Sequence, residues 1–126
     1  MPPHVLVVDD DAAFAELLTL LLSADRRVQV AGTAADGAEA VDLALELEPD
    51  VVLMDLHLPV IDGVEATRRI RRHLPDTRVV VVTSSNDPED RQRARQAGAD
   101  AFLPKSVGEQ ALVEAILSIG TEAGAR

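Results

Sequence analysis

The residues best suited to chemistry in this 126-residue chain are acidic, and they follow short apolar runs. Asp9 and Asp10 come directly after Val5–Val8, and Asp55 comes directly after Val51–Met54. Carboxylates brought together in this way repel one another or raise one another's pKa. A hard divalent cation removes that conflict, and Mg²⁺ prefers one or two carboxylates together with waters and a phosphate oxygen. The pattern therefore favours a magnesium site beside a phosphate group.

Two further polar residues follow apolar runs in the same manner. Thr83 follows Val79–Val82, and Lys105 comes two residues after Ala101–Leu103. A lysine ammonium is a compact charge with three donors, and threonine adds a hydroxyl, so this pair suits the oxygens of a transferring phosphoryl group. Each side chain alone would be an ordinary turn residue or a solvated charge. Together with the acidic residues they favour a single phosphoryl-transfer site.

Five short apolar runs alternate with helix-length segments. The runs are Val5–Val8, Val28–Val30, Val51–Met54, Val79–Val82 and Ala101–Leu103. Continuous apolar runs are typical of parallel strands buried on both faces. We therefore expect an α/β fold, a (βα)5 doubly wound three-layer sandwich with right-handed crossovers. The flavodoxin-like strand order 2-1-3-4-5 would place the first and third strands side by side, with the polar residues at one edge.

The helical segments carry typical start and stop residues. Asp87, followed by proline, has the position of a helix cap, and Gly98 that of a stop. Ser106 and Glu109 have the spacing of a capping box for the last helix. The spacing of apolar residues in the first helix predicts one apolar stripe of Phe14, Leu17, Leu18 and Leu21.

Composition limits the functions open to the chain. It has 22 Asp plus Glu against 12 Lys plus Arg, a formal net charge of −10 and no cysteine, and Lys105 is its only lysine. The acidic balance argues against direct nucleic-acid binding, and the lack of cysteine excludes thiolate metal sites and cysteine nucleophiles. With no signal peptide or membrane-spanning run, we expect a cytoplasmic domain over residues 1–120, with 121–126 as a tail or linker start.

Several short motifs, considered together, resemble the receiver domain of two-component response regulators. The resemblance covers about residues 4–119, and its motifs are Leu6–Asp10, Val52–Pro59, Asp62-Gly63, Val82–Ser84 and Gly98–Lys105. It implies a domain that a sensor histidine kinase phosphorylates on Asp55, which forms an aspartyl phosphate. Such a domain is a regulatory phosphoacceptor that catalyses only its own phosphorylation and dephosphorylation.

The same resemblance implies a role for each residue of the site. Asp10, Asp55 and the backbone carbonyl of His57 would ligate Mg²⁺ or Mn²⁺ directly, and Asp9 would join through a water molecule. The phosphoryl group itself would be contacted by Thr83 and Lys105.

The resemblance also implies a route from the phosphoryl group to an output surface. The Thr83 hydroxyl would move toward phosphorylated Asp55, and Phe102 would then turn from exposed to buried. An ordinary core role for Phe102 is the alternative. Leu103–Ser106 is most similar to NarL/LuxR-type regulators, which carry a C-terminal DNA-binding domain and regulate transcription. A stand-alone receiver, a receiver of a longer regulator and a homodimer formed on phosphorylation all stay open.

Three other functions fit part of the pattern. Asp9-Asp10-Asp11 matches the Asp-x-Asp motif of haloacid-dehalogenase-like phosphatases, but the chain is short for that core and Ala13 replaces the usual hydroxyl residue. A flavodoxin-like cofactor binder would need a Ser/Thr/Gly-rich loop where the three aspartates stand. A receiver could also act as a phosphorylation-independent interaction module, although the acidic residues, Thr83 and Lys105 are all present.

Overall fold

The computed structural model describes residues 2–124, and for residues 121–124 the backbone alone. Five parallel strands form one sheet in the order β2-β1-β3-β4-β5, which confirms the predicted fold class and strand order. The strands are β1 His4–Val8, β2 Gln29–Ala34, β3 Val51–Met54, β4 Arg78–Thr83 and β5 Ala101–Pro104. The helices are α1 Ala12–Ser23, α2 Gly37–Leu47, α3 Gly63–His73, α4 Pro88–Ala97 and α5 Glu109–Gly124.

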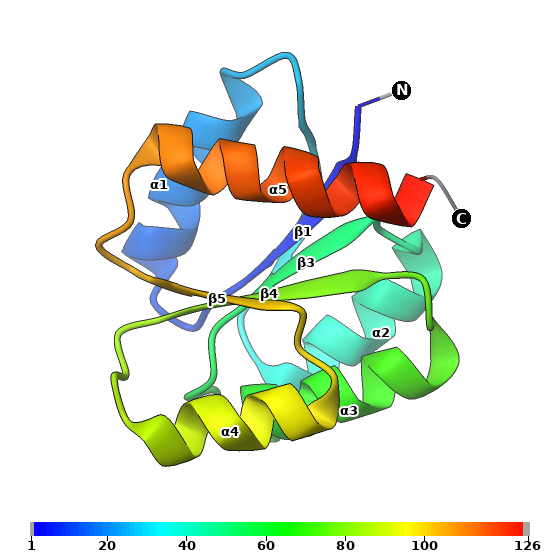
Figure 1. Cartoon of the computed structure of the whole chain (residues 1–126), viewed down its shortest axis with the longest axis vertical. Helices are drawn as coiled ribbons and strands as arrows, with labels where there is room; N and C mark the ends of the chain where they lie inside the picture. The colour runs from blue at the N-terminus through cyan, green and yellow to red at the C-terminus, as the bar shows by residue number, and fades with distance from the viewer. Residues whose placement is uncertain (1, 125–126) are drawn as a thin grey trace.

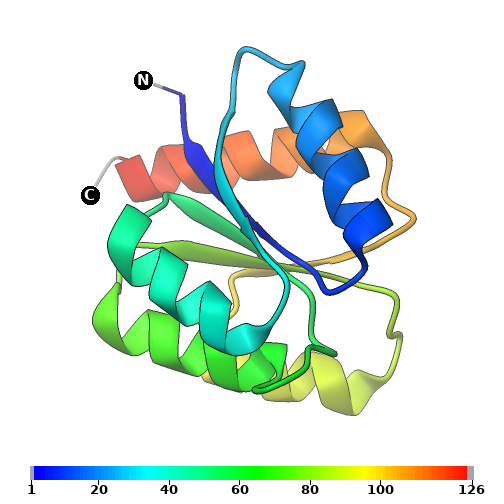
Figure 2. The same cartoon turned by 180° about the vertical axis from the view of Figure 1, so that it is seen from behind.

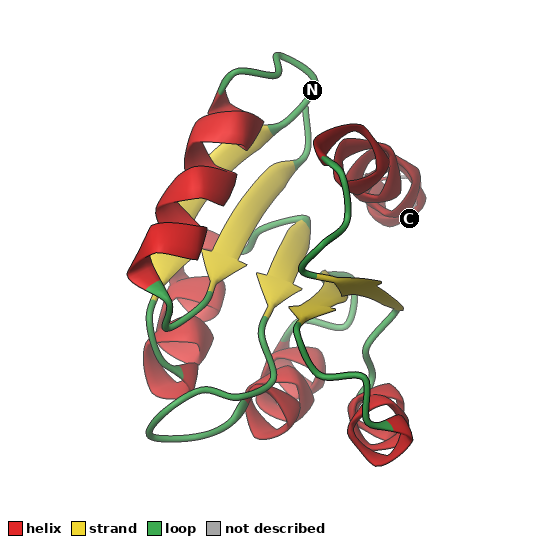
Figure 3. Ribbon diagram, turned by 90° about the vertical axis from the view of Figure 1, so that its left-hand side faces the viewer, coloured by secondary structure: helices red, strands yellow, loops and turns green. Residues whose placement is uncertain are grey.

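Helices cover both faces of the sheet, as Figures 1 and 2 show from opposite sides. α1 and α5 pack on one face, where Leu22 and Ile116 are fully buried against alternate strand residues. α2, α3 and α4 cover the other face, where Ile70 and Ala94 are fully buried. The edge-on view in Figure 3 shows the sheet between these two layers. None of the described helices is long and apolar enough to cross a membrane.

Two helices differ in detail from the sequence-based expectation. In α1, Leu17 is 50% exposed and Leu22 is buried instead, because the side of the helix that carries Leu22 faces the sheet. α5 begins at Glu109, so Ser106 does not cap it; a turn stands between β5 and this helix. α5 continues through Gly124, and the domain boundary at residue 120 stays a prediction. The end of the predicted tail, residues 125–126, lies outside the described residues.

The loop between β3 and α3 contains a strained residue, Val60, whose φ is +73° and which is 77% exposed. A residue other than glycine held in the left-handed region costs about 1–3 kcal/mol. Glycine removes the strain but loses more entropy on folding, so we expect Val60→Gly to raise the free energy of unfolding by about 1 kcal/mol. Urea unfolding followed by circular dichroism measures the change. Val60→Ala keeps the Cβ atom, and an equal gain in that variant would contradict the strain explanation.

Candidate functional site

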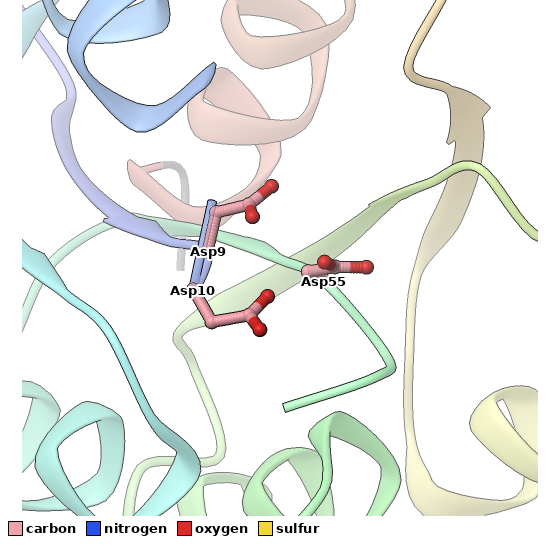
Figure 4. A group of neighbouring side chains, drawn as sticks. All are labelled: Asp9, Asp10 and Asp55. Carbon is pink, nitrogen blue, oxygen red and sulfur yellow. The ribbon is translucent and has the colours of Figure 1, made fainter. Parts of the chain in front are cut away.

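Three aspartates meet at the carboxyl ends of β1 and β3. The two strands pair in parallel with Val8 opposite Met54, so the residues that follow them, Asp9 and Asp55, lie at one edge of the sheet. These two residues are 3% and 5% exposed, whereas Asp10 is exposed. One carboxylate oxygen from each of the three lies within 4.8 Å of the others, and Figure 4 shows the group. The structure thus brings together the acidic residues that the sequence pattern predicted.

Lys105 reaches this acidic group from the turn that follows β5. Its Nζ atom lies 2.8 Å from Asp9 Oδ2 and 3.2 Å from Asp55 Oδ2, so a single ammonium bridges the ends of two strands. Burial lowers the pKa of Lys105, but the hydrogen bonds and negative charges of Asp9 and Asp55 outweigh this effect and raise the pKa above its ordinary value. The lysine therefore stays charged at neutral pH.

Backbone amides orient the two buried carboxylates. The amide of Asp11 donates to Asp9 Oδ1 at 2.8 Å, and the amide of Leu56 donates to Asp55 Oδ1 at 2.8 Å. Burial raises the pKa of Asp9, and the negative charge of Asp55 raises it further. Hydrogen bonds from Lys105 and from the Asp11 amide lower this pKa, but the net result is a pKa above the ordinary value. The single positive charge of Lys105 thus leaves negative charge unbalanced. An all-oxygen donor set with this excess charge fits Mg²⁺ or Mn²⁺.

Gly63 allows α3 to begin directly beside Asp55. A Cβ atom at residue 63 would lie 2.0 Å from the Asp55 carbonyl oxygen, and the Gly63 amide donates to the Leu56 carbonyl at 2.7 Å. Asp62 caps the same helix by accepting from the Glu65 amide at 2.8 Å. The Asp-Gly pair therefore fixes the backbone after Asp55, because any side chain at residue 63 would force that backbone away.

Thr83 and Phe102 line the same cavity, of about 130 Å³, near the carboxyl ends of β4 and β5. Thr83 is buried, and its hydroxyl accepts a hydrogen bond from the Ser85 amide at 3.2 Å. Phe102 is half-buried, and the guanidinium groups of Arg91 and Arg95 lie 5.6 and 5.9 Å from the centre of its ring. The two residues of the predicted switch therefore border one space.

The His57 side chain reaches α4. His57 Nε2 lies 3.2 Å from Asp90 Oδ2, and Ser85 Oγ donates to the same oxygen at 2.7 Å. One carboxylate in the first turn of α4 thus connects the loops that follow β3 and β4. Sequence reasoning did not find this role of Asp90, because an acidic residue is expected in the first turn of any helix. Metal ligation by the His57 backbone carbonyl stays a prediction.

The fold and this arrangement of residues define a class of protein. Comparison with known sequences identifies that class. Residues 5–117 match the family model of the response regulator receiver domain. The chain belongs to this family, as its motifs predicted.

Similar proteins differ in how much of their length this chain matches. Response regulator GacA of Pseudomonas aeruginosa is 43% identical over 115 residues, which are 91% of this chain and 54% of GacA. Protein-glutamate methylesterase/protein-glutamine glutaminase 2 of Pseudomonas fluorescens is 44% identical over 108 residues, 84% of this chain and 29% of that protein. The solved receiver domain of NarL from Mycobacterium tuberculosis aligns with a TM-score of 0.90 and 35% identity, covering 95% of this chain and 97% of that one. The chain thus spans about half of GacA and under a third of the methylesterase.

Proposed function

We propose that this chain is a phosphoacceptor switch in which Asp55 receives a phosphoryl group from a sensor histidine kinase. The observation that carries the proposal is the contact of Lys105 with both Asp9 and Asp55 at the sheet edge where the three aspartates meet. Membership of the receiver family supports the same function.

In the transfer step, a carboxylate oxygen of Asp55 attacks the phosphorus atom of a phosphohistidine. The new O–P bond forms as the P–N bond breaks, and the histidine nitrogen of the kinase leaves with the electron pair. A carboxylate is a weak nucleophile, so positioning and charge neutralisation drive the step. The Leu56 amide orients Asp55, and the Lys105 ammonium lies beside Asp55 Oδ2, where it can follow the negative oxygens of the transferring group.

Asp10, Asp55 and the His57 carbonyl would hold Mg²⁺ or Mn²⁺ directly, with Asp9 joining through water. When bound, the ion supplies neutralisation of the charge that develops on the phosphoryl oxygens. The convergence of three carboxylates and the raised pKa of Asp9, which is buried, support this assignment. Asp9 also holds Lys105 in place through its Oδ2 atom.

The proposed output step uses Thr83 and Phe102. The Thr83 hydroxyl donates to an oxygen of the phosphorylated Asp55 and gives up its contact with the Ser85 amide. Phe102 then turns further into the cavity that both residues line, which alters the face formed by α4 and β5. If Phe102 were an ordinary core residue, its exposure would not change on phosphorylation.

The proposed output is regulation of transcription by an effector domain, with a homodimer formed on phosphorylation and a location in the cytoplasm. GacA extends well beyond the part that this chain matches, which supports control of a further domain. The methylesterase relative indicates that, within the family, the further domain can be an enzyme. We propose that the receiver unit itself is not an enzyme toward any other substrate.

Incubation with Mg²⁺ and acetyl phosphate or phosphoramidate should add one phosphate to each chain, as measured by intact-protein mass spectrometry. These small donors require no kinase, because the receiver residues themselves catalyse the transfer in this proposal. Excess EDTA should prevent the addition, since the carboxylates would then repel the donor. Incorporation that is unchanged by EDTA, or no incorporation with Mg²⁺ present, would refute the proposed function.

A further inference from the structure

The ring of Phe14 lies against the ammonium of the chain's only lysine. Lys105 Nζ is 4.8 Å from the centre of the ring, which is within the range of a cation–π contact. The chain has no tryptophan or tyrosine and only two phenylalanines. The other ring, that of Phe102, lies beside arginines of α4. The Phe14 contact is therefore not a by-product of an aromatic-rich surface.

Phe14 is fixed by the same segment that carries the acidic residues. α1 begins two residues after Asp10, with Asp11 as its cap, and the Phe14 amide donates to Asp11 Oδ1 at 3.2 Å. The half-buried Phe14 side chain also packs against the hydrophobic core between α1, α5 and the sheet. The helix cap thus fixes the backbone of Phe14, and the core contacts fix its ring.

The ammonium of Lys105 is surrounded by these groups. Asp9 Oδ2 and Asp55 Oδ2 accept on two sides, the Phe14 ring lies on another, and the lysine side chain is only 20% exposed. During phosphoryl transfer the ammonium must change hydrogen-bond acceptors, because the new oxygens appear on Asp55. An aromatic face attracts the charge without requiring a particular hydrogen to point at it, so this contact persists while the hydrogen bonds change.

We propose that Phe14 is a positioning residue, whose ring holds the Lys105 ammonium at the phosphorylation site while its hydrogen bonds pass from Asp9 to the phosphoryl group. The placement of the ammonium stands on the contacts above, and the kinetic consequence rests on the proposed function. If Phe14 were only a core residue, leucine would replace it without effect on Lys105.

Nuclear magnetic resonance of protein labelled with ¹³C,¹⁵N-lysine tests the placement directly, because Lys105 gives the only labelled residue. The ring current of Phe14 should move the Lys105 ε-proton signal upfield. The shift should vanish in Phe14→Leu, persist in Phe14→Tyr, and persist in Phe102→Leu, which removes the other ring. An identical Lys105 signal in the wild type and in Phe14→Leu would overturn the inference.

A double-mutant cycle tests the consequence for phosphorylation. Phe14→Leu should slow phosphate incorporation from acetyl phosphate about fivefold, as expected for a partly exposed cation–π contact, and Phe14→Tyr should restore the rate. In a Lys105→Met background, Phe14→Leu should cause no further slowing. Equal slowing in both backgrounds would overturn a role that acts through Lys105. Absence of phosphate in the wild type would instead refute the proposed function. The resonance comparison is made without phosphorylation, so it would still confirm or overturn the placement of the Lys105 ammonium against the Phe14 ring.

Discussion

Asp55→Asn should accept no phosphate from acetyl phosphate in the presence of Mg²⁺, whereas the wild type gains one phosphate per chain. Asparagine keeps the shape of the side chain, and its amide oxygen can still accept from the Leu56 amide. The variant lacks the anionic oxygen that attacks phosphorus, and an amide is a far poorer nucleophile. Intact-protein mass spectrometry measures the loss, and circular dichroism checks that the variant folds.

Two control variants make this result specific. Asp42→Asn changes an exposed aspartate of α2, away from the acidic group, and should be labelled like the wild type. Asp9→Asn should be labelled more slowly, because Asp9 supports Lys105 and the metal site but is not the acceptor. Labelling of Asp55→Asn equal to that of Asp42→Asn would contradict the site assignment.

Lys105→Met should slow phosphate incorporation by about 10- to 100-fold, because a hydrogen bond to a charged group contributes about 1.5–3 kcal/mol. Lys105→Arg should also be impaired, although it keeps the charge. The ammonium fits between Asp9 Oδ2, Asp55 Oδ2 and the Phe14 ring, and a planar guanidinium cannot occupy that compact space in the same way. Time courses of phosphate incorporation compare the variants. A wild-type rate in Lys105→Arg would contradict the claim that the site requires a compact ammonium.

The same lysine variant has a consequence for stability. Burial already raises the pKa of Asp9, and Lys105→Met removes one of the hydrogen bonds that lower it. A carboxyl with a raised pKa binds its proton more tightly in the folded state, so the stability of the variant should fall as pH rises through the interval above the ordinary aspartate pKa. Urea unfolding at several pH values measures this slope, which should be steeper in Lys105→Met than in the wild type.

The sheet and the acidic group could be predicted from sequence because both depend on simple geometric rules. Valine-rich runs such as Val79–Val82 are buried on both faces, and parallel strands end at one edge. Given the strand order, Asp9 and Asp55 had to be neighbours, and the register of Val8 with Met54 places them so. The strand order itself came from analogy with a known fold, since run spacing alone does not determine which strands are adjacent.

The contact of Phe14 with Lys105 and the conformation of Val60 could not be predicted in this way. The meeting of Phe14 with Lys105 depends on how far α1 is rotated over the sheet, and the apolar spacing of that helix wrongly favoured Leu17 over Leu22 for the core. The left-handed conformation of Val60 likewise has no sequence signal, because valine disfavours it. Loop geometry is set by tertiary packing, and local patterns do not record it.

Reduction of the phosphorylated protein with borohydride, followed by peptide mass spectrometry, tests the central claim most directly. An acyl phosphate on aspartate is reduced to the side-chain alcohol, so the modified residue becomes homoserine and its position can be read from the fragments. In the sample treated with Mg²⁺ and acetyl phosphate, the proposed function predicts homoserine at residue 55 and an unmodified residue 9. Homoserine at residue 9, with Asp55 intact, would contradict the receiver mechanism and favour the Asp-x-Asp chemistry of a phosphatase.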